Sequence, residues 1–309
     1  MKDGASRLIY SLRHHKTVVD NKMIELKKVV VISLFTRQSY LRYFDVVKIK
    51  EIDRKMDEHV TVLNFDQIYR QQRFLQNPQY DWLNLDEIPH TNLLCEKDSL
   101  LEINEKIKPS IQHNKITLLG SGNYHYVAYL LLAKIEQPFT LVLFDHHTDM
   151  YPSPSESLIS CGSWVRTALK ALPQLNKVIM IGVGEDWSLH IPESIREKVV
   201  AFSENDIRNN FRGVIHQIQQ KVETENVYLS IDKDVLNMDE SVTAWDHGSM
   251  TLNQLTQMVN GLRKDYIVRG IDICGEYPLS PATMYQKQTR DILKKNELAN
   301  QQIIEQSIG

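Results

Sequence analysis

Short apolar runs alternate with amphipathic stretches along most of the chain after residue 115. The apolar runs predict buried strands, and the stretches with apolar residues three or four positions apart predict helices. The predicted strands are 116–119, 139–144, 177–183, 227–231 and 266–273, and the predicted helices are 126–134, 164–172, 206–222, 252–262 and a last one from about Gln286. Strands without a polar face that alternate with helices are typical of a parallel sheet covered by helices on both sides.

The first hundred residues give a weaker pattern. Strands are predicted at 29–34, 44–49 and 60–65, a helix at 67–76, and a loop between Pro78 and Pro89. We expect residues 1–95 to form an N-terminal region that either extends the sheet or makes an appended subdomain. Residues 96–309 are the predicted core.

Composition excludes several classes of protein. Among 309 residues, 42% are hydrophobic and the net charge is −3, so the charge favours neither a nucleic acid nor a membrane as partner. The three cysteines, Cys95, Cys161 and Cys274, are far apart and form no CxxC pair, which argues for a reducing compartment. Residues 1–16 are polar and basic, unlike a signal peptide, and no apolar run could span a bilayer. The expected location is the cytoplasm.

The strongest candidate for chemistry directly follows the predicted strand 139–144. Asp145, His147 and Asp149 stand at alternate positions where the chain leaves the sheet. Ligands bind at the carboxyl ends of strands in open parallel sheets, and buried charges need partners or metals. The alternative is a capped turn, in which the carboxylates accept hydrogen bonds from backbone amides.

Two more strand ends carry similar residues. Asp232 and Asp234 end the predicted strand 227–231, and two buried carboxylates need a compensating cation. Lys233 points the other way if the strand continues, so it is a poor counter-ion for them. The alternative here is a helix cap beside a surface acid. His125 follows a turn that contains Gly120 and Gly122; an isolated histidine is more often a core residue, but the position of His125 at a third strand end favours a ligand.

Together these segments offer two histidines and four aspartates. Such donors suit Mn²⁺, and also Fe²⁺, Ni²⁺, Co²⁺ or Zn²⁺. Four carboxylates exceed what one ion usually needs, so they predict two divalent ions about 3.5 Å apart that share carboxylates. Such a pair activates water at neutral pH, and the predicted reaction is hydrolysis at a polarised carbon or phosphorus centre.

The three segments resemble the arginase/agmatinase (ureohydrolase) superfamily in order and spacing. The matching runs are Gly-Asn-Tyr-His125, Asp145-His-His147-Thr-Asp149 and Ser230-Ile-Asp232-Lys-Asp234. The resemblance implies a three-layer α/β/α fold and a homo-oligomer. It also implies two Mn²⁺ ions held by six ligands, which are His125, Asp145, His147, Asp149, Asp232 and Asp234. The implied reaction is attack of a metal-bridging hydroxide on a guanidino or amidino carbon of a small molecule or a peptide arginine, which releases urea or a related product.

Several positions depart from the family pattern and concern the substrate. Cys161 stands where arginases have the histidine that moves protons, so His146 and His247 are the candidates for that role. Asp149 is expected to act in catalysis as well as to bind metal. The acid that holds the guanidinium in arginases corresponds to Glu276, one residue late, and a bulge at Gly275 could turn it back toward the site.

Two rival hypotheses remain open at this stage. A metal-dependent deacylase or phosphoesterase could use the same scaffold, because a fold does not fix its chemistry. A non-catalytic metal-binding or partner-binding member is the third hypothesis. Retention of all six ligands argues against it, because four buried carboxylates are costly to hold together.

Overall fold

The computed structural model of this protein describes residues 60–111, 115–280 and 282–308. The strands predicted at 29–34 and 44–49 lie outside the described residues.

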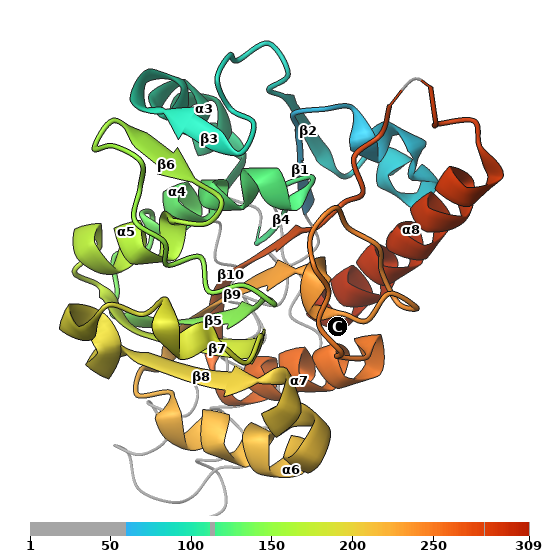
Figure 1. Cartoon of the computed structure of the whole chain (residues 1–309). Coiled ribbons are helices and arrows are strands. Elements are labelled where there is room, and N and C mark those ends of the chain that lie inside the picture. Colours follow the sequence, from blue (N-terminus) through green and yellow to red (C-terminus); the bar gives the residue numbers. More distant parts are fainter. Residues whose placement is uncertain (1–59, 112–114, 281, 309) are drawn as a thin grey trace, which may run out of the picture. The chain divides into compact units, whose positions relative to one another are not determined.

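An eight-stranded parallel sheet forms the centre of the described chain (Figure 1). The strand order is β2-β1-β4-β10-β9-β5-β7-β8, so the prediction of a mostly parallel sheet is confirmed. The strands are β1 (Val60–Asn64), β2 (Asp81–Asn84), β4 (Ile116–Leu118), β5 (Phe139–Phe144), β7 (Leu175–Val183), β8 (Val199–Ser203), β9 (Asn226–Asp232) and β10 (Ile267–Cys274). A separate antiparallel pair joins β3 (Leu94–Glu96) to β6 (Leu158–Ser160).

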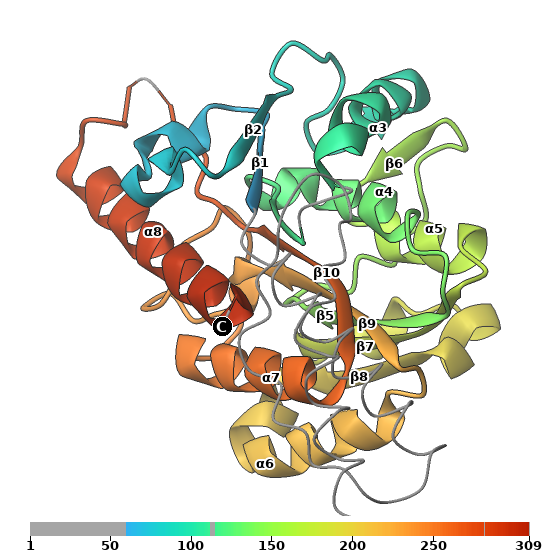
Figure 2. The same cartoon turned by 180° about the vertical axis from the view of Figure 1, so that it is seen from behind.

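Helices cover both faces of the sheet and make the predicted three layers (Figures 1 and 2). One hydrophobic cluster includes side chains of α3 (Lys97–Ile111), α4 (Ala128–Leu132) and α5 (Trp164–Ala171). A second cluster includes side chains of α6 (Glu204–Lys221), α7 (Leu252–Asp265) and α8 (Lys287–Ile308). Because the sheet is covered on both faces, all six residues of β5 are buried. Within the described residues, no helix is both long and apolar enough to cross a membrane.

Residues 60–95 differ in detail from the sequence prediction. The described part of this region adds β1 and β2 to the same sheet. The segment predicted as one helix at 67–76 forms two 3₁₀ turns, η1 (Ile68–Gln71) and η2 (Arg73–Gln76), with Gln72 extended between them. The predicted loop between Pro78 and Pro89 contains β2, an edge strand with two exposed and two half-buried residues. Because β2 is not buried, its sequence has no continuous apolar run, and the pattern of apolar residues does not predict a strand there.

A buried ion pair ties the end of β9 to the end of β10 and to α8. Lys233 and Glu276 are both fully buried, and the Lys233 ammonium donates to Glu276 Oε1. The amide of Gln72 donates to Glu276 Oε2 at 2.9 Å, and Asn300 of α8 donates to Glu276 Oε1 at 2.6 Å. Asn296 of α8 adds a longer bond of 3.4 Å to Glu276 Oε2. Lys233 thus points away from the aspartates on either side of it, as the sequence predicts.

We expect Lys233→Met to lower the free energy of unfolding of the metal-free protein by about 3–5 kcal/mol, because it leaves the Glu276 carboxylate buried without a cation. Urea denaturation in a chelating buffer measures the loss. The double variant Lys233→Met/Glu276→Leu removes both charges and should recover a large part of it. A single variant as stable as the parent protein would contradict this account of the pair.

Candidate metal centre

Three chain segments bring the six predicted ligands together at one edge of the sheet. Asp145, His147 and Asp149 follow β5, and Asp232 ends β9. Asp234 lies in the next short turn, η6 (Lys233–Val235), and His125 lies in η3 (Gly122–Val127), which follows β4. The carboxyl ends of parallel strands lie at the same edge, so residues distant in sequence become neighbours there. Five of the six side chains are at most 9% exposed, and His147 is the most open at 31%.

The first group of donor atoms surrounds the Nδ1 atom of His125. This atom lies 3.3 Å from Asp145 Oδ2, 3.2 Å from Asp149 Oδ2 and 3.6 Å from Asp232 Oδ2. Donor atoms of His125, Asp145 and Asp149 lie within 4.8 Å of one another, so one imidazole nitrogen and two carboxylate oxygens could share a cation, and Asp232 approaches the same nitrogen from a second group. We call this group the His125 position.

The second group surrounds the Nδ1 atom of His147. Asp234 Oδ2 lies 2.9 Å from this nitrogen, and Asp145 Oδ1 lies 3.6 Å from it. We call this group the His147 position. The two oxygens of Asp145 face different histidines, so one carboxylate is placed to serve both positions. This is the arrangement of a carboxylate that bridges two ions.

Backbone amides hold these carboxylates in place. Asp145 Oδ1 accepts from the amide of His147 at 2.6 Å, and Asp232 Oδ1 accepts from that of Asp234 at 3.1 Å. Asp234 Oδ1 accepts from the amide of His146 at 3.0 Å. The capped turns that the sequence left as alternatives therefore do occur. They coexist with the cluster, because the same side chains also face the two histidines.

Asp149 is oriented differently from the other three acids. Its backbone is left-handed, with φ of 51°, a conformation that aspartate tolerates better than most residues. The indole of Trp164 donates to its Oδ2 at 2.5 Å. The same oxygen faces His125, so Trp164 fixes the direction in which Asp149 offers it.

The cluster has more negative than positive charge. Burial raises the pKa of Asp149 and Asp234, and it raises that of Asp232 to about 7 with help from the neighbouring acids. Burial alone would lower the pKa of His147, but Asp145 and Asp234 raise it to about 12. Loss of contact with water is thus the main reason that the pKa values of the carboxyl groups rise, whereas the neighbouring acids are the reason that the pKa of His147 rises.

These residues fit a pair of divalent cations. Four carboxylates carry four negative charges, which two divalent ions would balance while both histidines stay neutral. Carboxylate oxygen and imidazole nitrogen are donors that Mn²⁺ and its neighbours in the first transition series accept. The chemistry of the donors and the shared Asp145 thus agree with the two-ion prediction.

A hydrogen-bonded chain behind His125 fixes its ring. The Nε2 atom lies 2.8 Å from the hydroxyl oxygen of Ser230, which donates to Asp272 Oδ1 at 2.8 Å. Ser230 has only one proton to give, so His125 Nε2 must be the donor of the first bond. Nδ1 then has its lone pair free to face the carboxylates. Partners of this kind orient metal-binding histidines in proteins.

The structure places the other predicted catalytic residues unequally. His146 is half-buried with its ring edge-on to His147, at 5.6 Å between ring centroids. His247 has both ring nitrogens in use, because Nε2 accepts from the amide of Thr243 at 3.0 Å and Nδ1 lies 2.9 Å from the carbonyl of Leu236. The side chain of His247 therefore stabilises the loop to which it belongs, and neither ring nitrogen is left to transfer a proton.

Glu276 does not face the cluster, because β10 ends at Cys274 and Gly275 forms a left-handed turn after the strand instead of the bulge considered from the sequence. Gly275 has φ of +90°, and an added Cβ there would lie 2.5 Å from Asp232 Oδ1. The turn sends Glu276 into its ion pair with Lys233 instead of toward the histidines. The substrate contact predicted for Glu276 therefore has no support in the geometry, because buried protein groups already use its carboxylate.

Three residues near the cluster were not assigned to it from the sequence. Gly122 permits close packing, since an added Cβ would lie 2.9 Å from Asp232 Oδ2 and 3.0 Å from the Trp245 ring. Ser230 belongs to a recognised motif, but its bond to His125 depends on three-dimensional packing. Cys274 lies within reach of Asp232, at 3.1 Å between Sγ and Oδ2. Side chains alternate between the two faces of a strand, so Asp272 and Cys274 of β10 share one face. The sequence alone could therefore have placed Cys274 beside the cluster.

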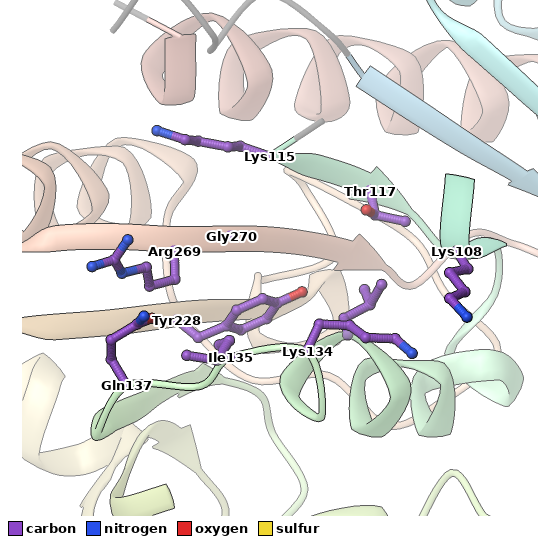
Figure 3. A pocket seen from close by; sticks show the side chains of 10 residues that line it. Lys108, Lys115, Thr117, Lys134, Ile135, Gln137, Tyr228, Arg269 and Gly270 are labelled. Carbon is purple, nitrogen blue, oxygen red and sulfur yellow. The ribbon is translucent and has the colours of Figure 1, made fainter. Parts of the chain in front are cut away.

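A separate cavity of about 400 Å³ involves none of the six ligands (Figure 3). Four of its lining residues are basic, namely Lys108, Lys115, Lys134 and Arg269. Two of these cations already have amide partners, since Lys134 donates to Asn104 at 2.7 Å and Arg269 to Asn226 at 2.8 Å. We therefore take the histidine–aspartate cluster as the functional site.

Comparison with known proteins gives one family and one well-covered relative. A sequence model of the arginase family matches residues 46–292. A protein of Thermotoga maritima, described only as uncharacterized, is 35% identical over 220 residues, which are 71% of this chain and 80% of that protein.

Solved structures of the same kind share the fold at low sequence identity. The agmatine ureohydrolase of Thermoplasma volcanium superposes with a TM-score of 0.56 at 15% identity and covers 82% of this chain and 91% of its own. The formiminoglutamase of Trypanosoma cruzi, solved with Mn²⁺, gives a TM-score of 0.59 at 11% identity and covers 82% and 95%. These likenesses show the fold.

We expect Asp234→Ala and Asp149→Ala each to abolish tight metal binding while the protein stays folded, because each removes a carboxylate that faces one histidine. Elemental analysis of protein purified after metal loading measures the bound ions, and circular dichroism checks the fold. Asp239→Ala, at an acid on the exposed loop after η6, is the matched control and should keep parental metal content. Parental content in Asp149→Ala or Asp234→Ala would refute the ligand assignment.

We expect Ser230→Ala to weaken metal binding by about 10–100-fold without removing a ligand, because His125 loses the partner that orients its ring. Competition with a chelator of known affinity measures the change. Ser99→Ala removes another buried hydroxyl, which donates to the carbonyl of Pro89 at 2.7 Å, and should leave the affinity unchanged. Equal affinities in the two variants would mean that the chain behind His125 has no effect on the metal.

Proposed function

Because the chain belongs to the arginase family, whose members are metal-dependent hydrolases, we propose that it hydrolyses a carbon–nitrogen bond of a linear amidine or guanidine. The observation that carries this proposal is the position of Asp145. Its two oxygens face two different histidines, at 3.3 Å and 3.6 Å, and the other three aspartates complete the groups on either side. A site for two ions suits this hydrolytic chemistry, because the ions can activate water and polarise the group under attack.

The six side chains would hold two divalent ions, and Mn²⁺ suits their oxygen and imidazole donors. Divalent ions held there would supply Lewis acidity, which activates water at neutral pH and polarises the group under attack. Asp145 would lie between the ions, with His125, Asp149 and Asp232 on one side and His147 and Asp234 on the other. The homo-oligomer and the cytoplasmic location expected from the sequence stay predictions.

The open side of the cluster favours a planar cationic group. His147 is the most exposed of the six ligands, and the ring of Trp245 stands edge-on to it at 5.7 Å between centroids. Trp245 is 37% exposed, and its indole nitrogen donates to Asn123 at 3.2 Å, which fixes the ring. An indole face attracts guanidinium and amidinium ions. We propose that Trp245 binds the cationic group in place of the acid that arginases use, since Glu276 is occupied elsewhere.

His146 is the better of the two candidates for giving a proton to the leaving amine. Its Nδ1 lies 3.3 Å from the carbonyl of Gly182, and its Nε2 has no hydrogen-bond partner among the described residues. His247, by contrast, has both nitrogens bonded to the backbone. A general acid needs a ring nitrogen that can reach the reacting group, so we assign the role to His146.

We expect metal-loaded protein to release urea or ammonia from at least one member of a set of linear amidines and guanidines. The set is arginine, agmatine, guanidinobutyrate, formiminoglutamate and arginine-containing peptides, each assayed with Mn²⁺. The matched control is Asp234→Asn, which preserves the shape of a ligand but removes its charge, and it should lower the rate by at least about a hundredfold.

Other outcomes of the same assay point to the rival functions. Release of acetate or phosphate without urea or ammonia would replace the proposal with a deacylase or a phosphoesterase. Full metal content without turnover of any substrate would favour a non-catalytic metal-binding protein. Loss of activity in Trp245→Ala through KM, with little change in kcat, would support the substrate contact proposed for that ring.

A further inference from the structure

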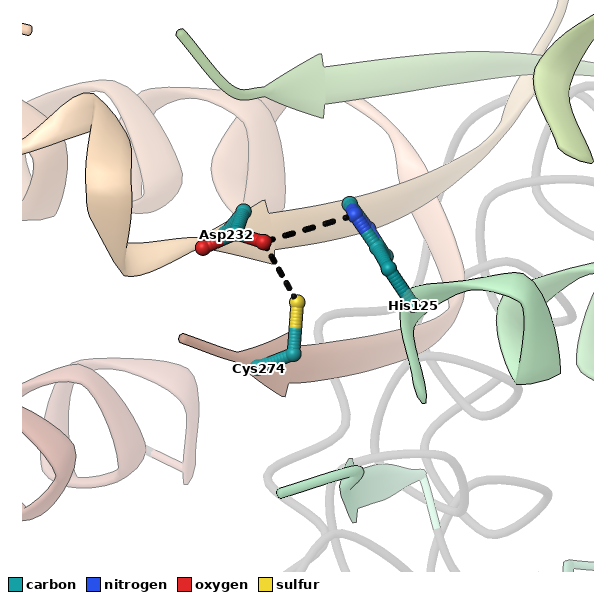
Figure 4. A group of neighbouring side chains, drawn as sticks. All are labelled: His125, Asp232 and Cys274. Atoms are coloured by element: carbon teal, nitrogen blue, oxygen red, sulfur yellow. Dashed lines mark hydrogen bonds and ion pairs between the residues drawn. The ribbon is translucent and has the colours of Figure 1, made fainter. Parts of the chain in front are cut away.

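Cys274 is built into the wall of the metal cluster. It is the last residue of β10 and is fully buried. In the parallel pairing of β9 with β10 its register partner is Asp232, so the two side chains emerge next to each other. The thiol donates to Asp232 Oδ2 at 3.1 Å (Figure 4). This is the oxygen of Asp232 that also faces His125, at 3.6 Å.

The same strand register places Cys274 close to the imidazole ring of His125. Two positions earlier, Ser230 and Asp272 are register partners and bind the Nε2 side of the imidazole. Side chains two apart on a strand share a face, so Asp232 and Cys274 continue this row one step further. Asp232 Oδ2 reaches the Nδ1 side, where the carboxylates gather. One donor atom from each of His125, Asp232 and Cys274 lies within 4.8 Å of the others.

We propose that Cys274 is an additional ligand of the ion at the His125 position, and that its sulfur makes this position prefer Zn²⁺, Co²⁺ or Fe²⁺ to Mn²⁺. The inference rests on the two-ion site proposed above and adds a residue to it. Thiolate ligands select softer ions, whereas oxygen donors favour Mn²⁺. The His147 position has only carboxylate and imidazole donors, so the two positions would differ in the ions that they prefer.

Coordination changes one bond and releases one proton. In the described structure the thiol hydrogen lies between Sγ and Asp232 Oδ2. An ion at the His125 position would take the place of that hydrogen and bind both atoms, and the proton would leave to solvent. The Sγ and Oδ2 atoms are already neighbours, so the exchange needs little movement of the strands.

The rival explanation is a neutral thiol that only orients Asp232. A buried cysteine often packs as a small apolar residue with a weak donor, and the bond at 3.1 Å satisfies that description. The two explanations differ in one measurable respect, which is whether sulfur enters the coordination shell of the ion. The substitution Cys274→Ser separates them further, because a hydroxyl can still donate to Asp232 but is a poor ligand for soft ions.

The test is a titration of metal-free protein with Co²⁺, followed by absorption spectroscopy. We expect the near-ultraviolet band of thiolate-to-cobalt charge transfer in the parent protein and its loss in Cys274→Ser, while the visible cobalt bands remain. The Zn²⁺-to-Mn²⁺ affinity ratio should fall by at least about tenfold in that variant. Cys95→Ser is the matched control, since Cys95 is buried and donates to the carbonyl of Glu96 instead. Cys161→Ser tests the half-buried cysteine, and both controls should keep the band.

A second measurement on the unmodified protein covers the case in which Cys274→Ser does not fold. X-ray absorption of the zinc-loaded protein should show a sulfur neighbour at about 2.3 Å from the metal. Cobalt or zinc bound without any sulfur signal would overturn the role of Cys274 and leave the two-ion proposal intact. Loss of the charge-transfer band in either control variant, but not in Cys274→Ser, would also overturn it. Failure to bind any divalent ion would instead count against the proposed function.

Discussion

Mutual repulsion among four buried carboxylates is the constraint that shapes this molecule. Asp145, Asp149, Asp232 and Asp234 lie within reach of two imidazole rings in a region almost closed to water. Anions so placed require oriented donors and cations. Backbone amides orient three of the acids, and the Trp164 indole orients Asp149. The remaining charge is what the two divalent cations of the proposed site would balance.

The parallel sheet explains why this cluster could be predicted from the sequence. The three motifs each follow a strand that reads as an apolar run, and parallel strands bring their carboxyl ends to one edge. Recognising the strands and placing their ends at one edge requires only the positions and the direction of the strands, not knowledge of long-range packing. The six candidate ligands could therefore be expected to meet, and the structure places them in overlapping groups of three whose donor atoms lie within 4.8 Å of one another.

The residues that escaped prediction depend on contacts between distant segments. Glu276 lies in a plausible position for the substrate, but Gly275 turns it toward Lys233 and toward amides of α8 and Gln72. His247 looks available in the sequence, yet its nitrogens are used by its own loop. The break between η1 and η2 has a similar origin, since Gln72 leaves the helical conformation and its side chain joins the Glu276 network. Such choices are decided by tertiary partners, which no local pattern encodes.

Alternation from Asp232 to Lys233, together with the Gly275 turn after β10, separates two kinds of charge at the same strand ends. Asp232 and Cys274 face His125, whereas Lys233 and Glu276 form their ion pair on the side of α8. The segment that offers Asp232 and Asp234 is thus anchored through Lys233, whose partner is held by Asn296 and Asn300 of α8. A displacement of α8 would move the anchor of two ligands without touching either carboxylate. The packing of this helix is therefore part of what sets the geometry of the candidate metal centre, because buried ionic groups tolerate little change in position.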